Sequence, residues 1–359
     1  MKTIKRIAAL ILVMVMALTV AGCHKKDEIA VTVDGVEFTS AYYMCALINA
    51  NMEAKGLVYE ALTDKEKESQ DIDYFSKKVE DKKFVDWVED KAIETLKEIA
   101  AYKLLCKENK IELDEEKVKT TETNAGFYWS SYGYSMYFEP NGVSQNTYVA
   151  YAKDSLYKES YFEFLYGKDG EKAISADDVK TKIYENFEIA DILDATYEEN
   201  ANDNDKKALK TRLENYAKEL QEGKMTYEQV YNEYNKVTAE TPEMNEESGE
   251  SAKDKYAQVL GSEDTNYNST HYSTVKAMKV GEAKVVENDS SSGLYLFFKQ
   301  DIKADAFYLS DLDMDARHLI ADEDFEKIIE DYAKKLNPEI NNYAVKQFKV
   351  KKIVEPSYS

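Results

Sequence analysis

The sequence has 359 residues and a formal net charge of −22 at pH 7. Such an acidic surface repels phosphates, so we expect no nucleic-acid partner. The length allows about two domains, each with a hydrophobic core of its own.

The N-terminus has the pattern of a secretory signal. The basic stretch "MKTIKR" precedes an uncharged apolar run over residues 7–20, which is shorter than the ~20 residues of a membrane-spanning helix. The run ends in "VAGC", which resembles a bacterial lipobox, so we expect residues 1–22 to be a lipoprotein signal peptide and Cys23 to be lipidated. Two acyl chains anchor a protein stably where one is marginal. The sequence therefore predicts a lipid-anchored protein on the extracytoplasmic face of the cell membrane; the alternative is an ordinary export signal with a chance cysteine.

The cysteine, histidine and glycine patterns do not indicate a metal or cofactor site. Cys45 and Cys106 lie in apolar, helical contexts, where they are either buried free thiols or a disulfide. There is no C-x-x-C, no H-E-x-x-H and no glycine-rich phosphate loop. An Asp-x-Asp-x-Asp run at 311–315 begins like a calcium loop, but Ala316 stands where that loop needs glycine. We expect no metal and no cofactor.

The first half of the chain reads as mainly helical. Residues 28–38 predict a hairpin that turns at Asp34-Gly35, with Thr39 or Ser40 capping the helix that follows. A second helix is predicted over 84–107 from its apolar stripe, and Asp114 caps a third.

Aromatic side chains then crowd residues 127–167. Such side chains bury much area with few torsions, so they suit a surface that binds unfolded chains. The alternative is that they form ordinary helix core. The candidate client-binding residues are Phe127, Tyr128, Trp129, Tyr132, Tyr134 and Tyr137.

The pattern changes after a helix at 174–187 that Ser175 caps. "IADILDATY" predicts a strand, and a helix stopped by Gly223, a short helix and an acidic loop at 237–255 follow. Two further strands are predicted in "KAMKVGEAKVV" and "SGLYLFFKQDI", the second of which ends at residue 302. A final amphipathic helix carries an apolar stripe that begins at Phe325.

The order of elements from 188 to 302 resembles the parvulin-type peptidyl-prolyl isomerase domain. "MTYEQVYNEYN", Gly281-Glu282 and "GLYLF" resemble motifs of that family. The resemblance places Asp191 and Tyr295 at the positions of the two family histidines. Both imidazoles and a glycine pair are absent, and the region of the family's proline-pocket aromatic falls near His271-Tyr272 without a clear phenylalanine. We therefore expect weak or no isomerase activity and name no catalytic residue.

The flanking segments resemble extracytoplasmic foldases of the PrsA and SurA group. The similar stretches are "VTVDGVEFTSAYY", "ISADDVKTKIYENF" and "DFEKIIEDYAKKL". The resemblance implies an α+β protein with a helical lobe at 23–187, an inserted parvulin-like domain at 188–302, and a segment at 303–359 that rejoins the lobe. It implies a membrane-anchored chaperone whose partners are unfolded or partly folded exported proteins. The alternative function is a solute-binding lipoprotein of a transporter, for which alternating strand–helix units in two lobes would be expected.

Overall fold

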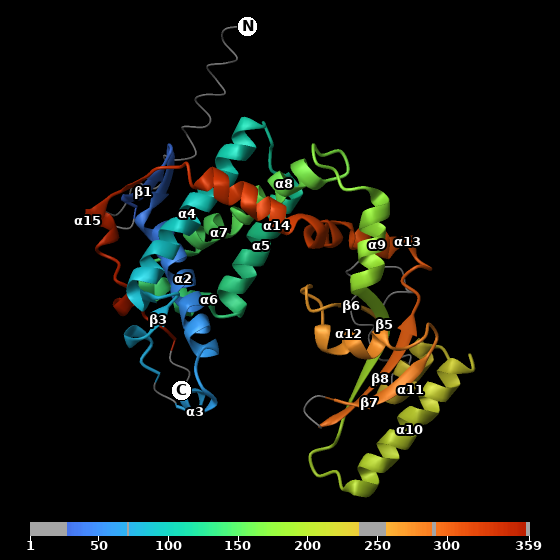
Figure 1. Cartoon of the computed structure of the whole chain (residues 1–359). Helices are drawn as coiled ribbons and strands as arrows, with labels where there is room; N and C mark the ends of the chain where they lie inside the picture. Colours follow the sequence, from blue (N-terminus) through green and yellow to red (C-terminus); the bar gives the residue numbers. More distant parts are fainter. Residues whose placement is uncertain (1–26, 70–71, 237–255, 289–291, 357–359) are drawn as a thin grey trace. The chain divides into compact units, whose positions relative to one another are not determined.

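The chain divides into two compact units, whose residues can be followed in Figure 1 by the colours along the sequence. The computed structural model describes residues 27–69, 72–236, 256–288 and 292–356. One unit comprises residues 1–164 with 325–359, and the other comprises residues 165–324. The fold is therefore α+β, as expected, with a helical lobe that takes both chain ends and a second unit inserted in it. The predicted signal peptide, Cys23 and the acidic segment 237–255 lie outside the described residues.

A small sheet joins the two ends of the chain within the lobe. Strands β1 (Ile29–Val33) and β2 (Val36–Thr39) form the predicted hairpin. Asp34 and Gly35 both have positive φ angles, of 43° and 86°, as a tight hairpin turn requires. Strand β9 (Pro338–Ile340) pairs antiparallel with the other edge of β1. The C-terminal segment thus completes the sheet that the N-terminal segment begins.

Two long helices carry most of the lobe's core. Helix α2 (Ser40–Glu60) begins after Thr39, whose side chain accepts a hydrogen bond from the backbone of Tyr42, and it packs along α4 (Phe84–Glu108). The remaining elements of the lobe are α3 (Asp64–Lys67), η1 (Tyr74–Ser76), β3 (Lys78–Val79), β4 (Lys82–Lys83), α5 (Glu115–Ser131), α6 (Tyr134–Phe138), η2 (Glu139–Asn141), α7 (Gln145–Lys153), α8 (Ser155–Tyr166), α15 (Asn342–Val345) and η3 (Val350–Lys352).

The final long helix returns the chain to the lobe. Helix α14 (Asp313–Ala333) carries Phe325, whose side chain is fully buried. The Phe325 ring lies 5.1 Å from that of Phe162, 6.1 Å from Tyr161 and 6.3 Å from Tyr102, measured between ring centroids. The apolar stripe predicted for this helix is therefore buried among aromatic side chains of α4 and α8.

The second unit is built on a four-stranded antiparallel sheet. Its strands follow the order β6-β5-β8-β7, with β5 (Phe187–Thr196) and β8 (Gly293–Gln300) at the centre, and β6 (Ala257–Gly261) and β7 (Ala283–Glu287) at the edges. All three pairings are antiparallel.

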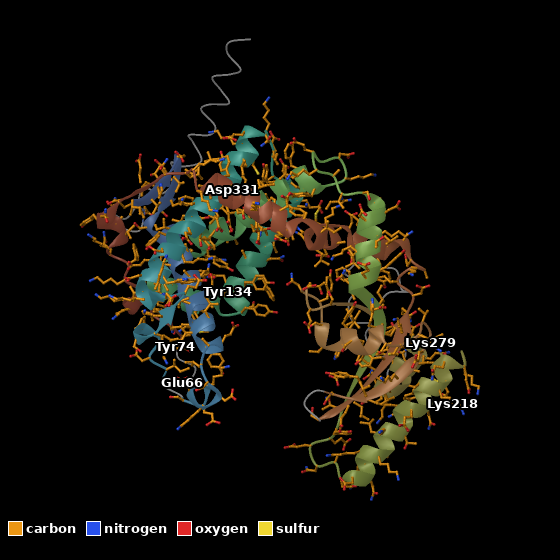
Figure 2. All side chains as sticks on the ribbon, in the orientation of Figure 1. Glu66, Tyr74, Tyr134, Lys218, Lys279 and Asp331 are labelled. Carbon is orange, nitrogen blue, oxygen red and sulfur yellow. The ribbon has the colours of Figure 1, made fainter. Side chains whose placement is uncertain are left out.

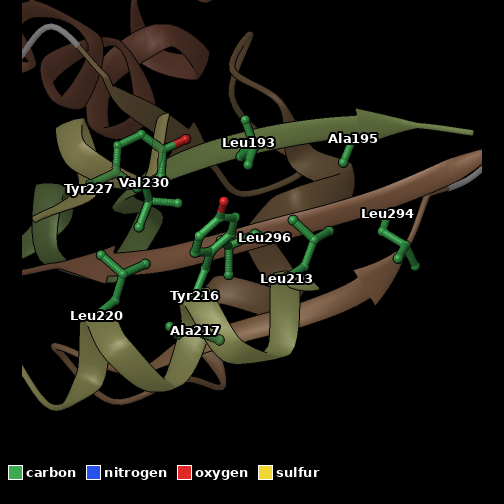
Figure 3. Packing of buried hydrophobic residues seen from close by; sticks show 11 residues of the cluster. Leu193, Ala195, Leu213, Tyr216, Ala217, Leu220, Tyr227, Val230, Leu294 and Leu296 are labelled. Carbon is green, nitrogen blue, oxygen red and sulfur yellow. The ribbon is translucent and has the colours of Figure 1, made fainter. Parts of the chain in front are cut away.

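Helices cover both faces of this sheet. One face packs against α10 (Asp203–Gln221) and α11 (Tyr227–Asn235), and the other packs against α12 (Ser269–Lys276). Figure 3 shows the core between α10, α11 and the sheet, where leucines and tyrosines interdigitate. Helices α9 (Ala176–Asn186), capped by Ser175 as predicted, and α13 (Ala306–Asp311) complete the unit.

The described part of the chain contains no disulfide and no helix suited to a bilayer. Cys45 and Cys106 are both buried and free, so the open question of their pairing is decided in favour of thiols. Within the described ranges, no helix combines the length and the apolar character needed to span a membrane. No group of three or more potential metal ligands occurs among the same residues.

Candidate functional site

The alternation of side chains along β5 decides where Asp191 points. Asp191 shares its face with Leu193 and Ala195, which pack against α10 and α11. Its side chain is only 4% exposed and accepts a hydrogen bond from the side-chain amide of Gln300. Asp191 is therefore a buried carboxylate in the core of the second unit.

A buried tyrosine lies close to this carboxylate. Burial, with the charge of Asp191 second, raises the pKa of Tyr227. The Tyr227 hydroxyl has no hydrogen-bond partner among the described residues, although it is buried. Asp191 and Tyr227 are therefore two buried polar side chains on the α10 and α11 side of the sheet.

Tyr295 lies on the other face of the sheet. In the register between β5 and β8, Tyr295 stands opposite Asp194, and Phe298 stands opposite Asp191. Tyr295 packs with the cluster between the sheet and α12, which includes Phe297. The structure does not bring Asp191 and Tyr295 together. Tyr295 shares its face with its partner Asp194, which is three residues from Asp191 along β5, and residues an odd number of positions apart in a strand point to opposite faces.

An imidazole does reach Tyr295, from a helix. The buried His271 ring of α12 lies 4.5 Å from the Tyr295 ring and 5.1 Å from the Phe297 ring, between centroids. The His271 Nδ1 is 2.9 Å from the side-chain nitrogen of Asn268, which can only donate. The Nδ1 is therefore assigned as the acceptor and the Nε2 as the protonated nitrogen.

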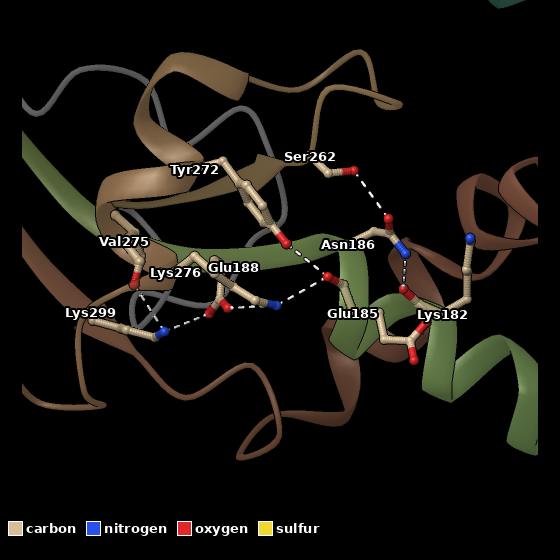
Figure 4. A network of polar contacts seen from close by, with 9 residues as sticks. All are labelled: Lys182, Glu185, Asn186, Glu188, Ser262, Tyr272, Val275, Lys276 and Lys299. Carbon is tan, nitrogen blue, oxygen red and sulfur yellow. Dashed lines mark hydrogen bonds and ion pairs between the residues drawn. The ribbon is translucent and has the colours of Figure 1, made fainter.

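A buried ion network fixes α12 against the sheet (Figure 4). The Lys299 Nζ lies 2.9 Å from a carboxylate oxygen of Glu188 and donates to the backbone oxygen of Val275, at 3.0 Å. Lys276 pairs with the same carboxylate at 3.4 Å, and the Tyr272 hydroxyl donates to the backbone oxygen of Glu185 at 2.7 Å. These contacts hold the helix that positions His271.

An aromatic cluster with one imidazole, from His271, and one phenol, from Tyr295, therefore lies between α12 and the sheet. The β5 side chains that share this face beside Tyr295 are Ile192 and Asp194, neither of which is an imidazole. The cluster is mostly buried, with Phe297 1% and His271 9% exposed.

A second candidate site is the aromatic patch on the lobe, which we define as Phe127, Tyr128, Tyr132, Tyr134 and Met136. Four of these side chains are exposed: Tyr132 by 66%, Phe127 by 55%, Met136 by 49% and Tyr128 by 43%. The Tyr132 ring contacts Phe127 at 5.5 Å and Tyr128 at 5.3 Å, and the Tyr128 ring lies 5.9 Å from that of Tyr134, labelled in Figure 2. The patch is thus a contiguous surface contributed by α5, α6 and the turn between them.

The patch is supported from below by a second aromatic layer. Buried Trp129 and Phe138 stack 6.2 Å apart, and Tyr148 of α7 contacts both, at 5.6 and 5.0 Å. Gly133 makes the turn between α5 and α6 with a φ of 73°, which disfavours any side chain. A rigid base of this kind keeps the exposed rings in place.

Similarity between this chain and known proteins is found among solved structures. No family model and no curated protein matches the chain. The chain resembles solved foldases. They are the foldase protein PrsA of Streptococcus pneumoniae (17% identity, TM-score 0.38, 71% of this chain and 88% of that one), of Lactococcus lactis (14%, 0.38, 88% and 96%) and of Bacillus subtilis (13%, 0.35, 72% and 89%). They belong to the foldase group that the sequence itself resembles.

The six aromatic residues predicted to bind clients differ in their accessibility. Phe127, Tyr128 and Tyr132 are exposed, and Tyr134 and Tyr137 are half-buried. Trp129 is buried beneath the others, so it supports the patch rather than forming its surface. Exposed Met136 of α6 was not predicted from the sequence. The contact of His271 with Tyr295 was not predicted either.

Proposed function

We propose that the chain is a foldase of exported proteins, which acts chiefly as a chaperone and binds unfolded segments through the aromatic patch. The observation that carries this proposal is the group of three exposed, mutually contacting aromatic side chains at the C-terminal end of α5, which are Phe127, Tyr128 and Tyr132. Soluble proteins seldom expose contiguous apolar surface unless it binds something. Aromatic rings suit unfolded clients, because they bury a large area while immobilising few torsions.

We further propose that prolyl isomerisation is weak or absent in this protein. Catalysis would have to lower a barrier of about 18–20 kcal/mol to rotation of the peptide bond. The α12 face has one imidazole, from His271, beside Tyr295, and the buried Asp191 on the other face has no access to a peptide there. The α12 face would then serve at most as a second contact surface for clients.

The proposal includes attachment to the outer face of the membrane through lipid on Cys23. It is supported by the charged n-region, apolar run and "VAGC" of the sequence. The alternative of a transporter's solute receptor has little support, because every strand pairing in the described residues is antiparallel rather than part of strand–helix–strand units.

The test compares suppression of aggregation with acceleration of a proline-limited refolding step. The triple variant Phe127→Ser, Tyr128→Ser, Tyr132→Ser should lose most suppression of aggregation while keeping its helical circular dichroism. Tyr343→Ser is the matched control, because this tyrosine of α15 is 63% exposed and lies outside the patch. Equal suppression by the triple variant and the parent would overturn the patch as the binding surface, and strong acceleration of refolding would overturn the expected lack of isomerase activity.

A further inference from the structure

The aromatic patch lies in a weakly charged stretch of an otherwise highly charged chain. Charged residues make up 32% of the sequence, yet residues 124–152 contain only one, Glu139, which is exposed. At the edges of this stretch Lys153 is paired with Glu122 at 2.6 Å. The stretch that forms the patch therefore contributes no cation and one carboxylate of its own.

The patch rings also differ from other aromatic rings of the protein in their contacts. Cations lie over tyrosines in both units, such as Lys55 over Tyr74 at 5.0 Å and Lys206 over Tyr197 at 5.2 Å. Among the described residues, no lysine or arginine lies over the rings of Phe127, Tyr128, Tyr132 or Tyr134. The exposed rings of Phe127, Tyr128 and Tyr132 thus carry no cation of this chain and could accept one from another molecule.

We propose that the patch selects unfolded client segments in which arginine or lysine alternates with bulky apolar residues. This inference rests on the proposed chaperone function and specifies its substrate class. The apolar residues of such a segment would bury against the rings and Met136, while its cations would lie over ring faces and beside Glu139. The net charge of −22 favours approach of a cationic segment and disfavours an acidic one. A second copy of this chain fits less well, because it would bring the same negative charge to the contact.

The experiment measures the binding of three fluorescent peptides to the purified protein by anisotropy. The peptides share phenylalanine and leucine at the same positions and differ only in the spacers, which are arginine, serine or glutamate. The arginine peptide should bind most tightly and the glutamate peptide most weakly. Added salt should reduce the difference between them, because exposed charges are screened.

A pair of substitutions separates the rings from the overall charge. Tyr128→Leu with Tyr132→Leu keeps apolar area but removes two ring faces, so the preference for the arginine peptide over the serine peptide should fall by about two- to fivefold for each ring. Tyr128→Phe with Tyr132→Phe keeps the rings and should retain the preference. Glu139→Gln should weaken binding of the arginine peptide and leave the serine peptide unchanged. All of these positions are exposed, so the variants should fold like the parent.

The outcomes distinguish this inference from the function on which it rests. Equal binding of all three peptides overturns the cationic preference while leaving chaperone function intact. An undiminished preference in the leucine variant overturns its assignment to the ring faces of the patch, again without affecting chaperone function. Failure to bind any peptide, together with no suppression of aggregation, overturns the proposed function itself. Self-association that the leucine variant abolishes would assign the patch to a second copy and would also overturn the inference.

Discussion

Asp191 is a buried carboxylate that stabilises the second unit rather than a group that faces a client. It lies on the α10 and α11 side of the sheet and accepts a hydrogen bond from Gln300. A buried donor that loses its acceptor costs about 1–3 kcal/mol. The role of Asp191 can therefore be tested through stability and activity together.

We expect Asp191→Ala to lower the free energy of unfolding of the second unit by about 1–3 kcal/mol. Any residual isomerase rate should be unchanged, because Tyr295 and His271 lie on the opposite face. Hydrogen exchange in β5 and β8 measures the first effect, and a proline-limited refolding assay measures the second. A variant of normal stability with a lost isomerase rate would contradict this placement. Asp191→His should likewise create no activity.

A second buried carboxylate, Asp154, organises the core of the lobe. It lies 2.7 Å from the Lys103 Nζ and accepts a hydrogen bond from the Tyr42 hydroxyl. Burial raises the pKa of Asp154, and the neighbouring Lys103 opposes this shift. Because the pKa is raised in the folded state, protonation of Asp154 stabilises the fold, and this contribution is lost as the pH rises through the folded pKa.

We expect Lys103→Met to lower the free energy of unfolding of the lobe by about 3 kcal/mol at neutral pH. The value is at the low end for breaking a buried pair, since 26% of the Lys103 side chain is exposed. The deficit should shrink as the pH falls toward the range where Asp154 takes up its proton. Urea denaturation at neutral and mildly acidic pH measures both. The control Lys91→Met removes an exposed pair with Glu53 and should cost less than about 1 kcal/mol at either pH.

At the scale of elements, α14 is the helix that ties the C-terminal segment into the lobe. Phe325 on this helix is fully buried and contacts three aromatic rings of α4 and α8. Its removal leaves a cavity that those rings cannot readily fill.

We expect Phe325→Ala to lower the free energy of unfolding of the lobe by about 3–5 kcal/mol, as for other buried phenylalanines. Hydrogen exchange should quicken in α4 and stay unchanged in α10, which belongs to the other unit. The control Phe307→Ala removes a phenylalanine of α13 that is 45% exposed, and it should have little effect. Unchanged protection of α4 in Phe325→Ala would contradict the burial of this ring in the lobe.

Most elements could be predicted because their signals are local. Thr39, Asp114 and Ser175 cap α2, α5 and α9 as the sequence suggests, since a cap depends only on the next few backbone amides. The short β3–β4 hairpin at residues 78–83 was not predicted, because a strand pair of this length has no hydrophobic alternation to identify it.

At the scale of the whole molecule, the expected lipid anchor would determine where the protein carries out its proposed function. We expect Cys23→Ala to release the protein from the membrane fraction or to leave the signal peptide attached, because no thiol would remain at the lipobox position. Cell fractionation and the mass of the mature chain measure these outcomes. Cys45→Ala is the control, because this thiol is buried in α2 and should not affect partition. Normal processing and membrane partition in Cys23→Ala would count against lipidation.

The sequence by itself determined the helical character of the first half, the caps and the aromatic character of α5 and α6. These follow from periodicity, capping and composition, which act over a few neighbouring residues. The α+β class and the lobe formed by both chain ends were expected from the resemblance of several short stretches to the foldase group, rather than from these local signals. Tertiary structure alone decided which face of the sheet Asp191 occupies, because a register step of one residue reverses every side chain of a strand. It also decided that Trp129 is buried while Tyr132 is exposed, and that His271 of α12 meets Tyr295 of β8. Those outcomes depend on packing between segments far apart in the chain, which no local pattern specifies.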